Sequence, residues 1–112
     1  MAVDYVRAMV AYKVGAEGGD ALSQHQVGFL YCEGDGVDVD YKQALAWFEK
    51  AAAQDHHDAI TQLGTMYFAG YGVTPSCRRT LEYFKRAAGL GHSKAVENMQ
   101  HLTEVNQKVT SR

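Results

Sequence analysis

The sequence predicts an all-α fold, a solenoid of stacked helix-turn-helix repeats. Residues 19–54 align with residues 55–90 without a gap, and ten of the 36 aligned positions are identical. A fixed period of this length is typical of stacked helical hairpins. The composition agrees, because one proline and eleven glycines among many alanine, leucine, glutamate and lysine residues favour helices separated by glycine-containing turns.

The first predicted helix covers residues 4–17, where apolar residues recur at helical spacing and glycines follow. Tyr12 in this helix aligns with Phe48 one period later, so the helix matches the second half of a repeat. Either the chain begins in the middle of a repeat or it is part of a longer array. We divide the sequence into a half-repeat helix (1–18), repeat 1 (19–54), repeat 2 (55–90) and a C-terminal capping helix (91–112).

Repeat 1 begins with a predicted helix over 21–33 that ends at a glycine, the residue expected for a left-handed C-cap. Gly28 lies inside this helix, where glycine costs about 1 kcal/mol relative to alanine, and Gly64 repeats it. We expect close approach of a neighbouring helix to compensate for this cost. The second helix should begin after Asp40, with Gln43 completing a capping box. Its predicted buried stripe is Ala44, Leu45, Phe48, Ala51 and Ala52.

Repeat 2 follows the same plan. Ser76 stands where Asp40 stood, and both residue types are preferred N-caps. The predicted inner stripe of its second helix is Leu81, Phe84, Ala87 and Ala88. A final helix is predicted from about 93 to 108, with Gln100 at the glycine position. Its polar residues suit a capping helix on which nothing stacks.

Charge and hydropathy exclude several classes of partner. Eleven basic and thirteen acidic residues create no cationic field, so we expect no nucleic-acid partner. The apolar runs are too short to span a bilayer and the N-terminus lacks a signal-peptide pattern, so we expect no membrane partner and a cytoplasmic location. Cys32 and Cys77 are expected to be free thiols, as in a reducing compartment.

Two stretches carry the pattern Leu/Val-Gly-x-x-Tyr-x-x-Gly-x-Gly-Val, followed near their ends by Phe-x-Lys/Arg-Ala-Ala. In repeat 1 these residues are Val27, Gly28, Tyr31, Gly34, Gly36, Val37, Phe48, Lys50, Ala51 and Ala52, and in repeat 2 Leu63, Gly64, Tyr67, Gly70, Gly72, Val73, Phe84, Arg86, Ala87 and Ala88. The pattern resembles the Sel-1-like repeat family, a branch of the tetratricopeptide-like solenoids. The resemblance implies a right-handed α/α superhelix of about six helices. It also implies a scaffold or adaptor that holds a peptide or partner protein in a groove lined by the first helix of each repeat.

If the groove follows that of related solenoids, its residues lie between the packing positions of the first helices. They are His25, Gln26, Phe29, Cys32 and Glu33 in repeat 1, Asp58, Thr61, Gln62, Thr65 and Phe68 in repeat 2, and Lys94, Glu97, Asn98 and His101 in the capping helix. Phe29 and Phe68 are the predicted anchors, because aromatic side chains contribute much interface energy. The alternative is that both fill space between helices.

No catalytic residue, cofactor or metal site is predicted. His25 and Cys32 share a helix face but lie two turns, about 10 Å, apart, too far for one zinc ion. The acidic turn of repeat 1 lacks the ligand order of an EF-hand. The Gly-x-Gly turns follow helices rather than strands, which argues against a phosphate loop.

Three further hypotheses stay open at this point. The chain could be an inhibitor or antitoxin-like regulator of one target protein, which a sequence does not separate from an adaptor. A thiol- or metal-dependent enzyme is disfavoured, because no third residue orients a histidine beside Cys32. A homodimer through the N-terminal half-repeat is the third hypothesis.

Overall fold

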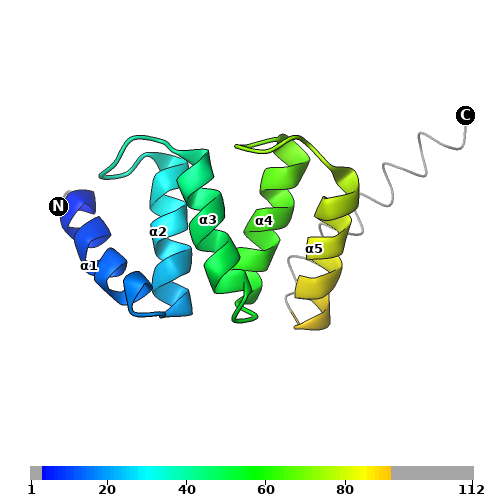
Figure 1. The fold of residues 1–112 in the computed structure, drawn as a ribbon, viewed down its shortest axis with the longest axis horizontal. Coiled ribbons are helices and arrows are strands. Elements are labelled where there is room, and N and C mark those ends of the chain that lie inside the picture. The colour runs from blue at the N-terminus through cyan, green and yellow to red at the C-terminus, as the bar shows by residue number, and fades with distance from the viewer. Residues whose placement is uncertain (1–3, 92–112) are drawn as a thin grey trace, which may run out of the picture.

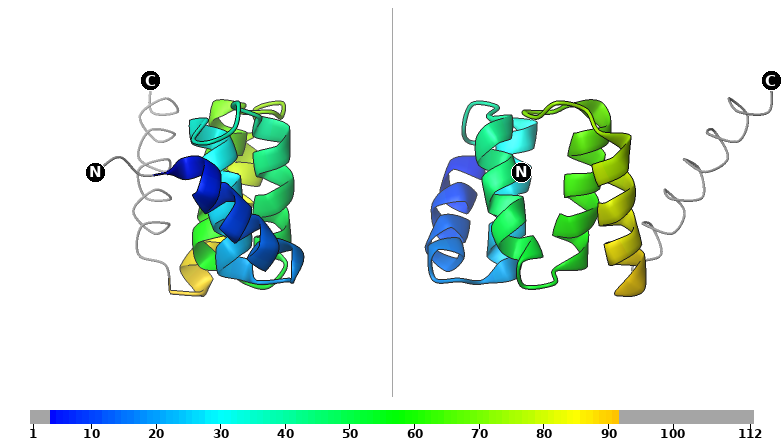
Figure 2. Two further views of the ribbon diagram at one scale, coloured as in Figure 1. Left: turned by 90° about the vertical axis from the view of Figure 1, so that its left-hand side faces the viewer. Right: turned by 45° about the vertical axis from the view of Figure 1, so that its right-hand side comes forward.

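The computed structural model describes residues 4–91, which form five α-helices arranged side by side (Figure 1). The helices are α1 (Tyr5–Glu17), α2 (Ala21–Glu33), α3 (Tyr41–Ala52), α4 (His57–Ala69) and α5 (Cys77–Gly89). Each helix packs against the next one along the chain. The pairs α2–α3 and α4–α5 are the hairpins of repeats 1 and 2, with α1 at the N-terminal end, as the turned views of Figure 2 also show. The predicted all-α solenoid is confirmed, and the predicted capping helix lies outside the described residues.

The predicted N-caps begin the second helix of each repeat. The Asp40 carboxylate accepts the Gln43 backbone N–H at 3.1 Å, and the Ser76 hydroxyl accepts the N–H three residues on at 3.2 Å. The capping box is wrong in its other half, because the Asp40 N–H donates to the Tyr31 carbonyl at 3.0 Å and is not left for Gln43. The Ser76 N–H donates likewise to Tyr67 at 2.9 Å. These bonds tie the two helices of each hairpin together at the turn.

Both helix glycines lie at close helix crossings, as predicted. A Cβ atom on Gly28 would stand 2.7 Å from the ring of Phe48, and one on Gly64 would stand 2.5 Å from the ring of Phe84. Real Cβ atoms do not approach that closely, so any side chain would push the helices of the hairpin apart. The absence of a side chain therefore lets the phenylalanine rings lie flat against the first helices.

Apolar side chains also join the half-repeat to repeat 1. Trp47 is buried in a cluster with Met9, Ala16, Val27 and Leu30. This cluster takes residues from α1, α2 and α3. A larger cluster around Phe48, Ile60 and Leu63 joins α3 to α4. The core therefore runs continuously from one repeat into the next.

Polar contacts occur both within repeat 1 and between the two repeats. The side-chain amide of Gln54 donates to the Gly19 carbonyl at 2.8 Å and to the Gln24 side chain at 3.1 Å. One repeat later, the Arg86 guanidinium donates to the Ala52 carbonyl at 2.6 Å, near the end of α3. A cation at this position also interacts favourably with the negative end of the helix dipole.

Candidate binding site between α2 and α4

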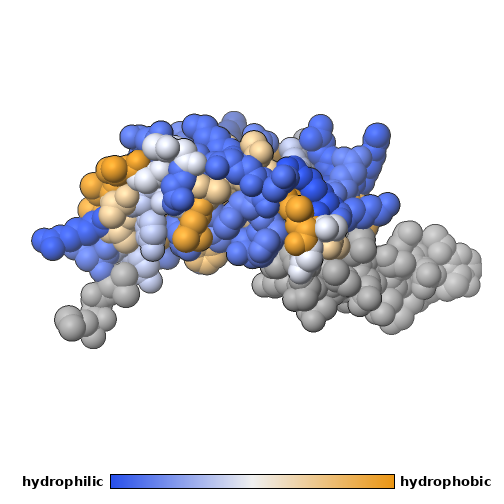
Figure 3. Space-filling view, turned by 90° about the horizontal axis from the view of Figure 1, so that it is seen from below, coloured by the Kyte–Doolittle hydropathy of each residue, from blue (hydrophilic) through white to orange (hydrophobic). Residues whose placement is uncertain are grey.

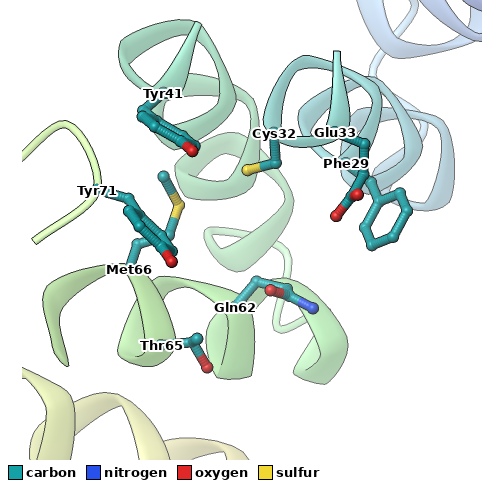
Figure 4. A pocket seen from close by; sticks show the side chains of 8 residues that line it. All are labelled: Phe29, Cys32, Glu33, Tyr41, Gln62, Thr65, Met66 and Tyr71. Carbon is teal, nitrogen blue, oxygen red and sulfur yellow. The ribbon is translucent and has the colours of Figure 1, made fainter. Parts of the chain in front are cut away.

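A cavity of about 350 Å³ lies between α2, α3 and α4 and beneath the turn that follows α4 (Figure 4). Its lining combines aromatic, sulfur-containing and polar side chains: Phe29, Cys32, Glu33, Tyr41, Gln62, Thr65, Met66 and Tyr71. Both first helices contribute, and they belong to different repeats. The cavity is therefore a product of repeat stacking.

A pair of stacked tyrosines closes one side of the cavity. Tyr41 and Tyr71 have ring centroids 4.8 Å apart and an interplanar angle of 15°. Tyr71 reaches this place because the next residue, Gly72, has a φ of +74° and lies so close to α3 that its Cβ would stand 2.9 Å from the Cβ of Tyr41. Repeat 1 has Asp35 at the position of Tyr71. The stack is thus particular to the junction of repeats 1 and 2.

The α2 side of the cavity carries a neutral thiol and a carboxylate. Burial, and to a smaller extent the charge of Glu33, raise the pKa of Cys32 to about 11. The thiol stays protonated at neutral pH and is a weak nucleophile, which counts against the thiol-enzyme hypothesis. Glu33 is exposed, and it alone carries a charge among the described residues that line the cavity. The rim is therefore negative.

The α4 side supplies a buried floor and polar atoms. Met66 is buried and closes the bottom of the cavity. The Thr65 hydroxyl donates to the Thr61 carbonyl at 3.2 Å, so its oxygen keeps lone pairs that a ligand N–H can use. Gln62, half-buried, offers both an amide donor and a carbonyl acceptor. A ligand in the cavity would meet apolar atoms below and hydrogen-bonding groups beside it.

Five of the predicted groove residues line this cavity: Phe29, Cys32, Glu33, Gln62 and Thr65. Phe68 is 55% exposed on α4 but is not part of the lining, and Gln26 is half-buried on α2. Asp58 is half-buried beside His57, with its carboxylate 3.5 Å from the imidazole. The predicted residues Lys94, Glu97, Asn98 and His101 lie outside the described residues.

Two of the predicted groove residues do not present polar atoms to a groove. The prediction is wrong for Thr61, whose side chain is buried and donates its hydroxyl to the His57 carbonyl at 3.0 Å. It is also wrong for His25, because both of its ring nitrogens are buried. The ring of His25 lies instead between those of Phe48 and His56, with centroid distances of 5.6 and 5.1 Å.

Three lining residues were not predicted, namely Tyr41, Met66 and Tyr71. Met66 aligns with Leu30, a packing position, and nothing in the sequence indicates that it also lines a cavity. For Tyr71 the sequence did contain a signal, namely the glycines on either side of it. Both glycines have positive φ, and the turn that they form fixes the direction of the Tyr71 side chain. The direction of that turn, towards Tyr41, follows only from stacking the repeats.

The buried histidine pair should make stability depend on pH. Burial, then the neighbouring His56, lower the pKa of His25, while Asp58 acts in the opposite direction. Burial likewise lowers the pKa of His56. The unfolded chain therefore binds more protons than the fold below the ordinary histidine pKa of about 6.5, so stability is complete above that value and falls as the pH drops through it.

We expect the free energy of unfolding of the wild type to decrease between about pH 7.5 and about pH 5. The His25→Leu variant should lose less over the same interval, because it keeps an apolar side chain beside Phe48 and removes one titrating group. Urea denaturation followed by circular dichroism at several pH values measures both slopes. Equal slopes for the two proteins would contradict this assignment.

Two other features that could indicate function are absent from residues 4–91. Between residues 4 and 91, no three His, Cys, Asp or Glu side chains come together in a way that could hold a metal ion. No helix there combines the length and the apolar character needed to cross a bilayer. Cys32 and Cys77 are free cysteines on different helices.

The chain matches the Sel1 repeat family over residues 21–56 and 57–92, two segments that start 36 residues apart. No curated protein matches it in sequence. Two crystal structures share its fold over 88% of the chain. One is a protective antigen of uropathogenic Escherichia coli strains with an SLR fold, at 27% identity and a TM-score of 0.85. The other is a Sel1 repeat protein from Oxalobacter formigenes, at 30% identity and a TM-score of 0.83.

The chain spans 21% of the length of the first of these proteins and 41% of the second. The resemblance predicted from the sequence is confirmed: the chain belongs to the Sel1 repeat family.

Proposed function

We propose that this protein binds a peptide segment of a partner protein along α2 and α4, with one apolar side chain of that segment in the cavity. Sel1 repeats generally act as scaffolds for protein–protein interactions. The proposal assigns binding and no chemical reaction. The observation that supports it is the cavity of about 350 Å³ that two repeats build together on the face of their first helices.

The lining indicates which side chains the partner should present. Met66 and the Tyr41–Tyr71 stack offer an apolar and aromatic surface, on which an aliphatic or aromatic side chain gains free energy by leaving water. Glu33 at the rim is negative, so a lysine or arginine next to that apolar residue is favoured. The proposed ligand is therefore a peptide with an apolar anchor beside a basic residue.

The fold also reduces the entropy that binding must overcome. The lining side chains project from helices that are packed on both sides, and the turn carrying Tyr71 is fixed against α3. A site that is already ordered loses little conformational freedom when the ligand arrives. Binding should therefore order the peptide much more than the protein.

Selection from a library of displayed random peptides tests the proposal without knowledge of the natural partner. We expect enriched sequences that pair an aliphatic or aromatic residue with a lysine or arginine. A synthetic peptide of this kind should bind Tyr71→Asp, which introduces the residue found in repeat 1, at least tenfold more weakly than wild type, a loss of about 1.4 kcal/mol. Isothermal titration calorimetry measures both affinities.

Phe68→Ala is the matched control, because Phe68 is an exposed aromatic residue of α4 that lies outside the lining. It should bind the selected peptide as wild type does, and both variants should keep the wild-type melting temperature within a few degrees. Equal affinity of wild type and Tyr71→Asp would refute the cavity as the binding site. A stronger effect of Phe68→Ala would move the site to the outer part of α4.

A further inference from the structure

Helix α1 differs from the other described helices in the number of large apolar side chains that it leaves exposed. Its charged residues are Arg7, Lys13 and Glu17. Five large apolar side chains of α1 are exposed: Tyr5, Val6, Val10, Tyr12 and Val14. Figure 3 shows apolar surface gathered over the end of the molecule that α1 forms. Exposed apolar patches of this kind mark interaction sites.

The three valines form a continuous ridge with i, i+4, i+8 spacing, and they are 61%, 63% and 69% exposed. The repeat period shows how unusual this ridge is. The aligned residues on α3 are Lys42, Ala46 and Lys50, and those on α5 are Arg78, Glu82 and Arg86. All six are exposed. The outer face of the second helix therefore carries charged residues in both complete repeats, and it is wholly apolar only in α1.

A preceding repeat would not cover this ridge. The first helix of such a repeat would pack on Ala8 and Tyr12, which align with Ala44 and Phe48. It would leave Val10 in water, because the aligned Ala46 is exposed although α3 has helices on both sides.

We propose that the ridge of α1 docks on the same ridge of a second copy of this chain, forming a two-fold symmetric dimer. Residues at i, i+4 and i+8 form the ridges that interdigitate in the commonest helix–helix packing, at a crossing angle of about −50°. A two-fold contact needs a self-complementary surface, and Val10 at the centre with Val6 and Val14 on either side provides one. Asp4 and Glu17 balance Arg7 and Lys13, so two copies of α1 do not repel each other.

The size of the surface sets the expected strength. The exposed parts of the three valines amount to on the order of 300 Å² per copy, so the ridge contributes on the order of 600 Å² of apolar surface to a dimer, the small size of a transient interface. The dimer should therefore be reversible, with a dissociation constant in the micromolar range. The ridge is formed by α1 alone, so this proposal does not depend on the peptide site.

Sedimentation equilibrium of the full chain tests the dimer. The mass of the wild type should rise from the monomer value of 12.3 kDa towards twice that value as the concentration goes from low to high micromolar. Val10→Lys should remain a monomer over the same range, with an unchanged circular dichroism spectrum. Ala46→Lys makes the same substitution at the aligned exposed position of α3 and should dimerise like wild type.

A wild-type chain that stays at monomer mass throughout would overturn the proposal. So would a dimer that persists in Val10→Lys, because another surface would then hold it together. Vesicles containing anionic lipid serve as the probe for a different occupant. Binding of a monomeric wild type to these vesicles, lost in Val10→Lys, would assign the ridge to a lipid surface and equally refute the second copy.

Discussion

The Phe48→Ala variant is expected to lose about 4 kcal/mol of the free energy of unfolding. The Phe48 side chain has no exposed surface, and its ring fills the space over Gly28. It belongs to the cluster that holds α3 to α4, so its removal weakens both the hairpin and the junction between repeats. The helices cannot move together to fill the space left by the ring without disturbing the hydrogen bond from the Asp40 N–H to the Tyr31 carbonyl. Urea denaturation measures the loss directly.

Phe68→Ala again supplies the control, this time for stability. Its side chain is 55% exposed, so truncation should change the free energy of unfolding by no more than about 0.5 kcal/mol. A chain of 112 residues is typically stable by about 5 to 15 kcal/mol, so the Phe48 variant should lie near the limit of folding. A loss below about 1 kcal/mol would mean that the hairpins do not depend on this ring.

The parts of the fold that local signals encode could be predicted from the sequence. Gly34 and Gly70 end the first helices in the left-handed conformation, as their positions indicated. Asp40 and Ser76 begin the second helices. Such signals act within one turn of helix, so they are legible without knowledge of the neighbours. Because the sequence repeats, each of these signals occurs once in repeat 1 and again in repeat 2.

Contacts between repeats were harder to predict, because their partners lie about one period apart. Trp47 packs on α1, and Arg86 donates a hydrogen bond near the end of α3. Nothing in the sequence around either residue indicates which residues it contacts. The aligned residues are Tyr83 and Lys50, so the junctions differ in chemistry even where the backbone repeats. The constant repeat length therefore predicts that the repeats stack, but it does not predict which side chains form the contacts between them.

The candidate site shows the same division. Spacing along α2 and α4 located Phe29, Cys32 and Gln62 near one another, because these positions lie between packing residues. The same spacing did not indicate that Thr61 and the ring nitrogens of His25 are buried. A helix that packs against neighbours on two sides buries more of its residues than a helix with a single packing stripe. Tyr41 and Tyr71 come from a different helix and a turn, which no pattern within the first helices could reveal.

Gly64→Ala is expected to destabilise the protein by about 2 kcal/mol, although alanine is the better helix former. The new Cβ would lie 2.5 Å from the Phe84 ring, which is itself buried and has no free space to enter. Gly89→Ala isolates the effect of helix propensity, since a Cβ there meets nothing within 4 Å. That variant should be neutral or gain up to about 0.5 kcal/mol. The opposite signs are measurable by urea denaturation.

A double mutant identifies the cause of the loss. If overlap with the ring destabilises Gly64→Ala, then Phe84→Leu should cost less in the alanine background than in the wild type, because the smaller side chain leaves room for the Cβ. We expect a coupling energy of about 1 kcal/mol between the two positions. Additive losses would instead place the strain in the backbone of α4. In that case Gly64 would be required for the backbone conformation of α4, and the close approach of α5 would be a consequence of the glycine rather than the reason for it.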